Sequence, residues 1–237
     1  MNYKDQFGVP QPDESPTLAL FSVYIGFALF PPTLPAIQTT QKFWSILGLN
    51  TDIGKFSYQI EPQVRLVDDP RLLEQFLSRF SGGYNASSQW AFWLAAGWFS
   101  TAQDEDTKNQ EFRLWQDAIY NETLNSNRIF FRSRIEQRRS KGSDQWGYRF
   151  RGRILINHPL TASISLVGSN EFFINFNRPA WLSTKTIDQN RLSFGLEQQA
   201  STWLNIGAGY LNQVIFSTPI QMGHVITFNV QIHLPGG

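Results

Sequence analysis

The sequence contains no cysteine and only three histidines in its 237 residues. The absence of cysteine excludes disulfides, thiolate chemistry and cysteine metal sites, and it suits a protein of an oxidising compartment. The formal net charge is only +1, so no polyanionic partner such as a nucleic acid is implied. Lysine is scarce beside arginine, and arginine is the better residue for buried, hydrogen-bonded charge.

Long hydrophobic runs are also missing. The continuous apolar run LALFSVYIGFALF, at 18–30, is shorter than the roughly 18 residues that a spanning helix needs. Two prolines stop it and TLPA follows, a pattern typical of an export signal cleaved after Ala36. The leader carries more acid than base, contrary to the usual positively charged start of an export signal. The alternative interpretation of the apolar run is a buried strand or helix. We therefore expect residues 1–36 to be a leader with a signal-peptide-like segment and residues 37–237 to be one barrel domain.

Alternation of polar and apolar residues dominates the rest of the chain. The stretches FFRSRIEQR and YRFRGRI place an ionic residue at almost every second position. Successive side chains of a strand point to opposite faces, so each stretch predicts a strand with one apolar and one cationic face. The candidate strands are 43–50, 56–68, 75–86, 89–101, 110–122, 127–139, 146–157, 161–176, 190–200, 203–216 and 223–234.

The segment DDPRLLEQFLSRFSGG gives conflicting signals. Asp69 and Pro70 resemble a helix start, and the leucines and phenylalanines after them also fit helical spacing. Its second half nevertheless alternates, because Phe76 and Phe80 share one face and Arg79 lies on the other. We expect a strand there.

Alternation alone does not show which face points outward. Most of the candidate strands are about 11 to 14 residues long, enough to cross hydrocarbon at a tilt, whereas strands of soluble proteins usually have about 5 to 6. Their connections alternate between long and short, as around a membrane barrel with tight periplasmic turns. We expect the apolar face to lie in lipid and the charged face in a lumen. The alternative is a soluble sandwich or lipocalin-like barrel with a solvated charged face.

The expected lumen-lining side chains form a candidate network of ion pairs, because basic and acidic residues face each other on neighbouring strands. They are Arg65, Arg79, Glu111, Arg113, Arg132, Arg134, Glu136, Arg138, Arg149, Arg151, Arg153, Glu171, Arg191 and Glu197.

The expected fold is therefore all-β, a transmembrane antiparallel up-and-down barrel of about 10–12 strands. The candidate strands number one more than ten, whereas single-chain bacterial barrels have an even number. Either 43–50 is not a full wall strand, which leaves ten, or one more strand is hidden, which makes twelve.

Six stretches resemble, in order, a known family: EFRLWQDA, RIFFRSRIEQR, WGYRFRGRILINHPL, SNEFFINFN, QNRLSFGLEQQASTWLNIGAGYLNQ and GHVITFNVQI. They are similar to the uncharacterised Gram-negative proteins called domain of unknown function 2490, over roughly 44–234. The resemblance implies an exported outer-membrane β-barrel. It implies no activity and no catalytic residues.

The expected function is a narrow, arginine-lined passive channel, porin-like, or a structural component of the envelope. The expected location is the bacterial outer membrane, with outer-membrane lipids and the barrel assembly machinery as partners and small anions as candidate solutes. We expect no cofactor and no metal site, because each acidic residue has an arginine candidate nearby. An outer-membrane lipid-modifying enzyme, such as a phospholipase or lipid A deacylase, is the alternative, and a conceivable triad for it is His224 with Asp188 and a serine such as Ser217.

Overall fold

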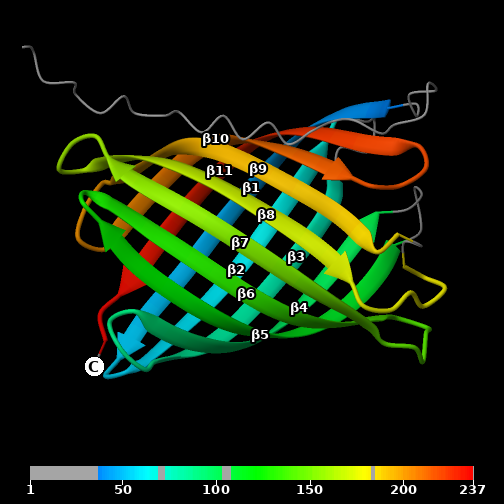
Figure 1. Ribbon diagram of the computed structural model, residues 1–237, viewed down its shortest axis with the longest axis horizontal. Helices are drawn as coiled ribbons and strands as arrows, with labels where there is room; N and C mark the ends of the chain where they lie inside the picture. Colours follow the sequence, from blue (N-terminus) through cyan, green and yellow to red (C-terminus); the bar gives the residue numbers. More distant parts are fainter. Residues whose placement is uncertain (1–36, 69–72, 103–107, 183–184, 237) are drawn as a thin grey trace, which may run out of the picture. The chain divides into compact units, whose positions relative to one another are not determined.

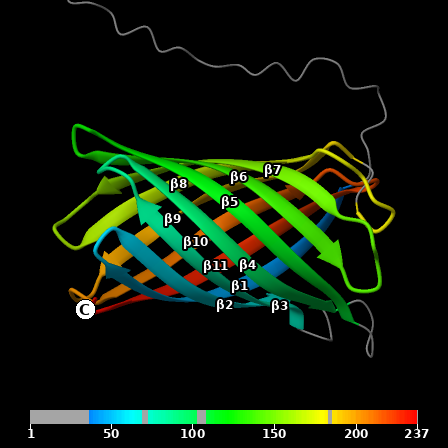
Figure 2. The same cartoon turned by 90° about the horizontal axis from the view of Figure 1, so that it is seen from below.

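The computed structural model of the protein describes residues 37–68, 73–102, 108–182 and 185–236. These residues form eleven strands and no helix. The prediction of an all-β barrel is confirmed, because the strands close into one barrel (Figures 1 and 2). The strands are β1 (Ile37–Ile53), β2 (Phe56–Val67), β3 (Leu73–Asn85), β4 (Trp90–Ala102), β5 (Lys108–Leu124), β6 (Asn127–Ser140), β7 (Gly147–Pro159), β8 (Ile164–Asn175), β9 (Ile187–Gln199), β10 (Leu204–Ile215) and β11 (Ile220–Leu234).

Each strand pairs antiparallel with its neighbour in sequence, and the barrel closes through a parallel pair of β1 and β11. That pair runs from Ile37 opposite Ile220 to Thr51 opposite Leu234. The expectation of an even number of wall strands is therefore wrong for the described residues. A parallel pair also satisfies the backbone donors and acceptors of both edges, so closure does not require an even number.

The first predicted strand is longer than expected. The sequence indicated 43–50, whereas β1 covers seventeen residues and is a full wall strand. The prediction for the ambiguous segment is confirmed from Leu73 onward, since β3 is a strand. Residues 69–72, with the possible helix start, lie outside the described residues.

The connections separate the barrel into two rims. One rim carries the short connections, such as the tight turns at 54–55 and 125–126. The other carries the longer ones, among them 141–146 and 176–186. An odd number of strands places the start of β1 on the rim of the long connections and the end of β11 on the opposite rim, where Figure 1 marks the C-terminus.

The two faces of the wall differ sharply in chemistry. Large apolar side chains are exposed on the outer face along whole strands, for example Phe76, Phe80 and Tyr84 on β3. The buried residues are instead mostly charged, polar and aromatic, for example Glu136, Arg149 and Phe173, with few aliphatic ones such as Leu77 and Val225. The side chains of the interior are therefore held by ion pairs and aromatic contacts rather than by an aliphatic core. No helix among the described residues is long and apolar enough to cross a membrane, a finding that concerns helices alone.

Candidate functional site

The barrel encloses a cavity of about 680 Å3, to which all eleven strands contribute side chains. Trp181 and Leu182, from the connection between β8 and β9, also line it. The Trp181 Nε1 atom donates a hydrogen bond to the Gln145 carbonyl oxygen at 3.2 Å, which ties this connection to the neighbouring one on the same rim. The cavity therefore has an aromatic boundary at the rim of the long connections.

The structure places the predicted lumen residues on the inner side of the wall. All of them line the cavity except Glu111 and Glu136, and those two are buried in contact with cavity-lining arginines. This placement follows from the period of two along each strand, because the predicted lumen residues of any one strand share the same parity.

The densest group of charges lies on β5–β8. Arg134 binds Asp117 through two hydrogen bonds, with Nε–Oδ1 at 2.6 Å and Nη2–Oδ2 at 2.7 Å. Glu136 is 1% exposed and accepts hydrogen bonds from both Arg149 and Arg151. Bidentate and charge-assisted bonds of this kind are short and directional, so they fix the side chains of adjacent strands in one arrangement.

Carboxylates are shared between arginines elsewhere in this group. Glu111 accepts from Arg113 and from Arg138, with the closest atoms at 2.9 Å and 2.5 Å. Glu171 accepts from Arg151 at 2.8 Å and also from Arg132 on β6, at 2.6 Å. The carboxylate of Glu171 on β8 therefore joins three strands.

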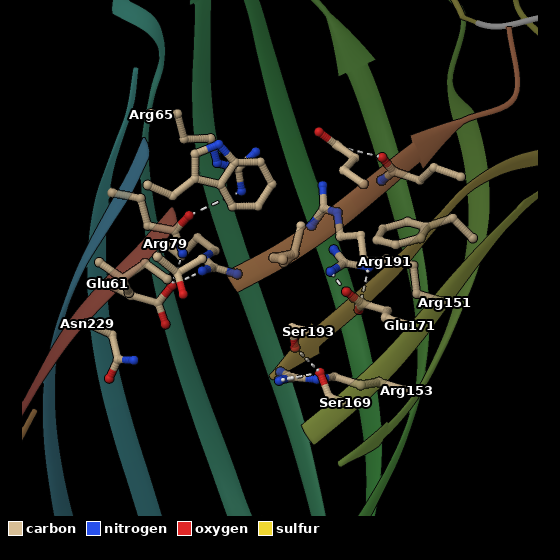
Figure 3. Close-up of a pocket in the computed structure, with 18 of the residues that line it drawn as sticks. Glu61, Arg65, Arg79, Arg151, Arg153, Ser169, Glu171, Arg191, Ser193 and Asn229 are labelled. Atoms are coloured by element: carbon tan, nitrogen blue, oxygen red, sulfur yellow. Dashed lines mark hydrogen bonds and ion pairs between the residues drawn. The ribbon is translucent and has the colours of Figure 1, made fainter. Parts of the chain in front are cut away.

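A second group of charges lies on β1–β3. Glu61 forms an ion pair with Arg79, and Glu74 forms one with Lys42. Figure 3 shows Glu61 and Arg79 on one side of the cavity and Arg151 with Glu171 on the other. The open part of the lumen lies between two charged walls.

Three inward arginines have no carboxylate within ion-pair distance among the described residues. Arg65 donates to the amide oxygens of Gln75 and Gln63, and Arg153 donates to the Ser169 hydroxyl at 3.2 Å. The Arg191 side chain makes no hydrogen bond to a described residue, and its Nε is buried without a partner. Glu197 also lines the cavity and forms no ion pair with a described residue, so it offsets only one of these three charges. The cavity consequently holds an excess of positive charge.

Aromatic rings accompany the arginines, and sequence reasoning missed this role. The guanidinium carbon of Arg113 lies 3.7 Å from the ring centroid of Phe99, and that of Arg134 lies 4.7 Å from Trp115. Arg151 and Arg191 both lie against Phe173. Cation–π contacts of this kind stabilise a cation that has left water.

A sequence signal for these rings did exist. Trp115 has the same parity as its neighbours Arg113 and Asp117, and Phe173 has the same parity as Glu171. In strands whose charged side chains point inward, an aromatic residue in step with the charges must point inward too. Asp117 and Glu61 share the parity of the inward charges on their own strands and belong to the interior network. Asp188 has the opposite parity to Arg191, but it lies at the register shift between β8 and β9 and binds Arg149 in the interior.

The candidate catalytic triad is not assembled. His224 lies on the outward-facing parity of β11, where its Nδ1 is 2.5 Å from the Tyr210 hydroxyl. Asp188 lines the cavity and binds Arg149 at 2.7 Å, and the Ser217 hydroxyl donates to the Pro219 carbonyl. The barrel wall therefore separates the histidine from the aspartate. Among the described residues no group of three or more histidine, aspartate or glutamate side chains is arranged to hold a metal ion.

The fold and the cavity define a closed β-barrel protein with an apolar outer face and an arginine-rich interior. The chain belongs to the family DUF2490, described as a protein of unknown function, which matches residues 41–222. The match covers nearly the whole wall and every residue of the predicted lumen network. No curated protein and no solved structure matches the chain.

Proposed function

We propose that the protein is an outer-membrane barrel that lets small anions pass through its lumen. The observation that carries this proposal is the excess of positive charge in the cavity, which arises from Arg65, Arg153 and Arg191. A pathway lined by unpaired cations concentrates anions and repels cations.

A lipid environment for the outer face is supported by aromatic side chains near the ends of the strands. At the rim of the short connections, Trp90 contacts Tyr120 at 5.0 Å between ring centroids, and Tyr120 contacts Phe131 at 6.3 Å. Phe56 and Tyr84 form a further pair at this rim. Tyrosine and tryptophan favour the headgroup region, where an apolar ring and a polar tip are both accommodated.

Polar residues on the outer face support the same environment. The side-chain amides of Gln116 and Gln137 form two reciprocal hydrogen bonds, at 3.2 Å and 3.0 Å, and Asn170 and Asn190 do the same at 3.1 Å and 3.2 Å. All four point away from the cavity according to the parity of their strands. Mutual pairing suits surroundings that offer no water to the amides.

The size of the barrel limits the current that it can carry. Barrels of about eight strands have room only for side chains, and the eleven described strands here surround many long arginines. We therefore expect a small conductance. The dense network on β5–β8 favours a structural envelope component as the second candidate function, since charges that pair across the lumen also obstruct it.

The channel is tested by the reversal potential across a planar bilayer under a salt gradient. The wild type should prefer chloride over potassium, and Arg153→Glu should weaken or reverse that preference. The change from arginine to glutamate alters the charge by two units. At about 8 Å from a passing ion in water this alters the energy of the ion by roughly 1 kcal/mol, which corresponds to about a fivefold change in the permeability ratio. Arg153 is chosen because the charge reversal leaves no carboxylate without its partner, whereas reversal at Arg151 would disturb both Glu136 and Glu171.

The matched control is Arg139→Glu, which makes the same change of charge on the outward parity of β6, where Arg139 pairs with the exposed Asp144. It should leave the selectivity of the channel unchanged. Cation preference in the wild type, or equal effects of the two variants, would contradict an anion pathway through the lumen. A bilayer that stays silent with folded protein would favour the structural role.

A further inference from the structure

Two of the unpaired arginines converge on one tryptophan. The guanidinium carbons of Arg65 and Arg191 lie 4.0 Å and 5.0 Å from the ring centroid of Trp44. Trp44 is only 4% exposed, and its Nε1 is buried without a hydrogen-bond partner. The Nε atoms of both arginines are buried and unpartnered as well. Three donors without acceptors are therefore gathered around one indole.

The barrel brings these groups together from distant parts of the chain. Arg65 lies opposite Trp44 in the pairing of β1 with β2, whereas Arg191 belongs to β9. Between them, β11 and β10 contribute only Thr227 and Gly209 at the level of Trp44. A Cβ atom on Gly209 would lie 2.6 Å from the Phe194 carbonyl oxygen, so only glycine fits there. The small residues leave room beside the indole for the Arg191 side chain.

A purely structural interior does not account for this cluster. Arg79, Arg113, Arg132, Arg134, Arg138, Arg149 and Arg151 each have a carboxylate partner, so the barrel pairs buried arginines where pairing serves stability. Leaving two buried cations without a carboxylate partner and an indole N–H without an acceptor costs stability, and such costs are characteristic of binding sites. The missing partner must supply acceptor oxygens and negative charge.

We propose that Trp44, Arg65 and Arg191 bind a small dianionic oxyanion, of which inorganic phosphate is the simplest example. Two uncompensated guanidinium groups match two negative charges, and their planar donor arrangement matches the oxygens of a phosphate. The indole N–H supplies one further donor. This proposal deepens the proposed anion pathway, on which it rests, by assigning it a binding site and a class of solute.

The test is calorimetric titration of the folded full chain in zwitterionic detergent with phosphate, at constant ionic strength in chloride. The wild type should bind one phosphate saturably and more tightly than acetate, which carries a single charge. Arg65→Gln and Arg191→Gln should each lower the phosphate affinity by about 10- to 100-fold, because each removes charge-assisted hydrogen bonds.

Arg153→Gln is the matched control, since Arg153 also lacks a carboxylate partner among the described residues and lines the same cavity, but it is not one of the arginines whose guanidinium lies over Trp44. It should change the phosphate affinity by less than about threefold. Equal losses of phosphate affinity in all three variants would overturn the site, because they would show that the positive charge of the whole cavity, and not a local site, attracts phosphate. Absence of saturable binding in the wild type would overturn it too.

Folding is monitored by circular dichroism and heat-modifiable mobility on gels, and removal of an unpaired buried charge should not impair it. Trp44→Phe gives a second, independent variant that keeps an aromatic ring and removes the N–H donor. It should weaken phosphate binding by at least about threefold, and unchanged affinity would overturn the assignment of Trp44. Binding without conductance would contradict the channel and leave the site standing, whereas conductance without binding would overturn the site alone.

Discussion

Replacing Glu136 by glutamine is expected to lower the free energy of unfolding by about 3–5 kcal/mol. Glu136 is the acceptor for Arg149 at 2.9 Å and 2.5 Å and for Arg151 at 2.8 Å. Glutamine has nearly the same shape, but it carries no charge and directs an NH2 group at a guanidinium. The variant therefore leaves two buried cations short of negative charge, and this deficit is the source of the loss.

The measurement is equilibrium unfolding in urea, with the barrel inserted in lipid vesicles and followed by tryptophan fluorescence. The control is Asp144→Asn, which makes the same chemical change at a fully exposed carboxylate that pairs with the half-exposed Arg139. It should have no measurable effect, because exposed pairs contribute little. A near-neutral result for Glu136→Gln would show that the interior is as wet as an outer surface and would favour a soluble barrel with a solvated charged face.

The second large effect concerns the outer face. Replacing Ile154 by arginine places a charge in the middle of β7, on the outward parity, and should cost about 2–4 kcal/mol in a bilayer. The same substitution at Ile53, the last residue of β1, lies at a rim and should cost no more than about 1 kcal/mol. The difference between the two costs shows whether the middle of the outer face lies deeper in hydrocarbon than the rim does.

Both variants are compared by urea unfolding in vesicles and by the amount of protein recovered in the outer-membrane fraction. Ile154→Arg should reduce this recovery, whereas Ile53→Arg should not. If Ile154→Arg proved neutral or stabilising while the protein stayed in an aqueous fraction, a water-exposed outer face would be established and the outer-membrane location would be wrong.

The sequence by itself determined which way most side chains point. Arg132, Arg134 and Glu136 follow one another at every second position, and a strand of this length presents them on one face whatever surrounds it. The sequence also indicated all eleven strands. It predicted β1 to be shorter than it is, and it predicted the last strand to begin at residue 223, whereas β11 begins at Ile220. These properties are local, so a window of some ten residues contains the necessary information.

Tertiary structure alone decided the closure and the pairing of charges. The sequence offered eleven candidate strands, and only the rule for single-chain bacterial barrels favoured an even number. In the structure β1 meets β11 in a parallel pair, which depends on the curvature of the entire sheet. The partners of Glu171 on β6 and β7, and the approach of Arg191 to Trp44, depend likewise on register and barrel closure. Alternation determines the face of a side chain, but contacts between strands far apart in sequence arise only when the closed barrel brings them within a few ångströms.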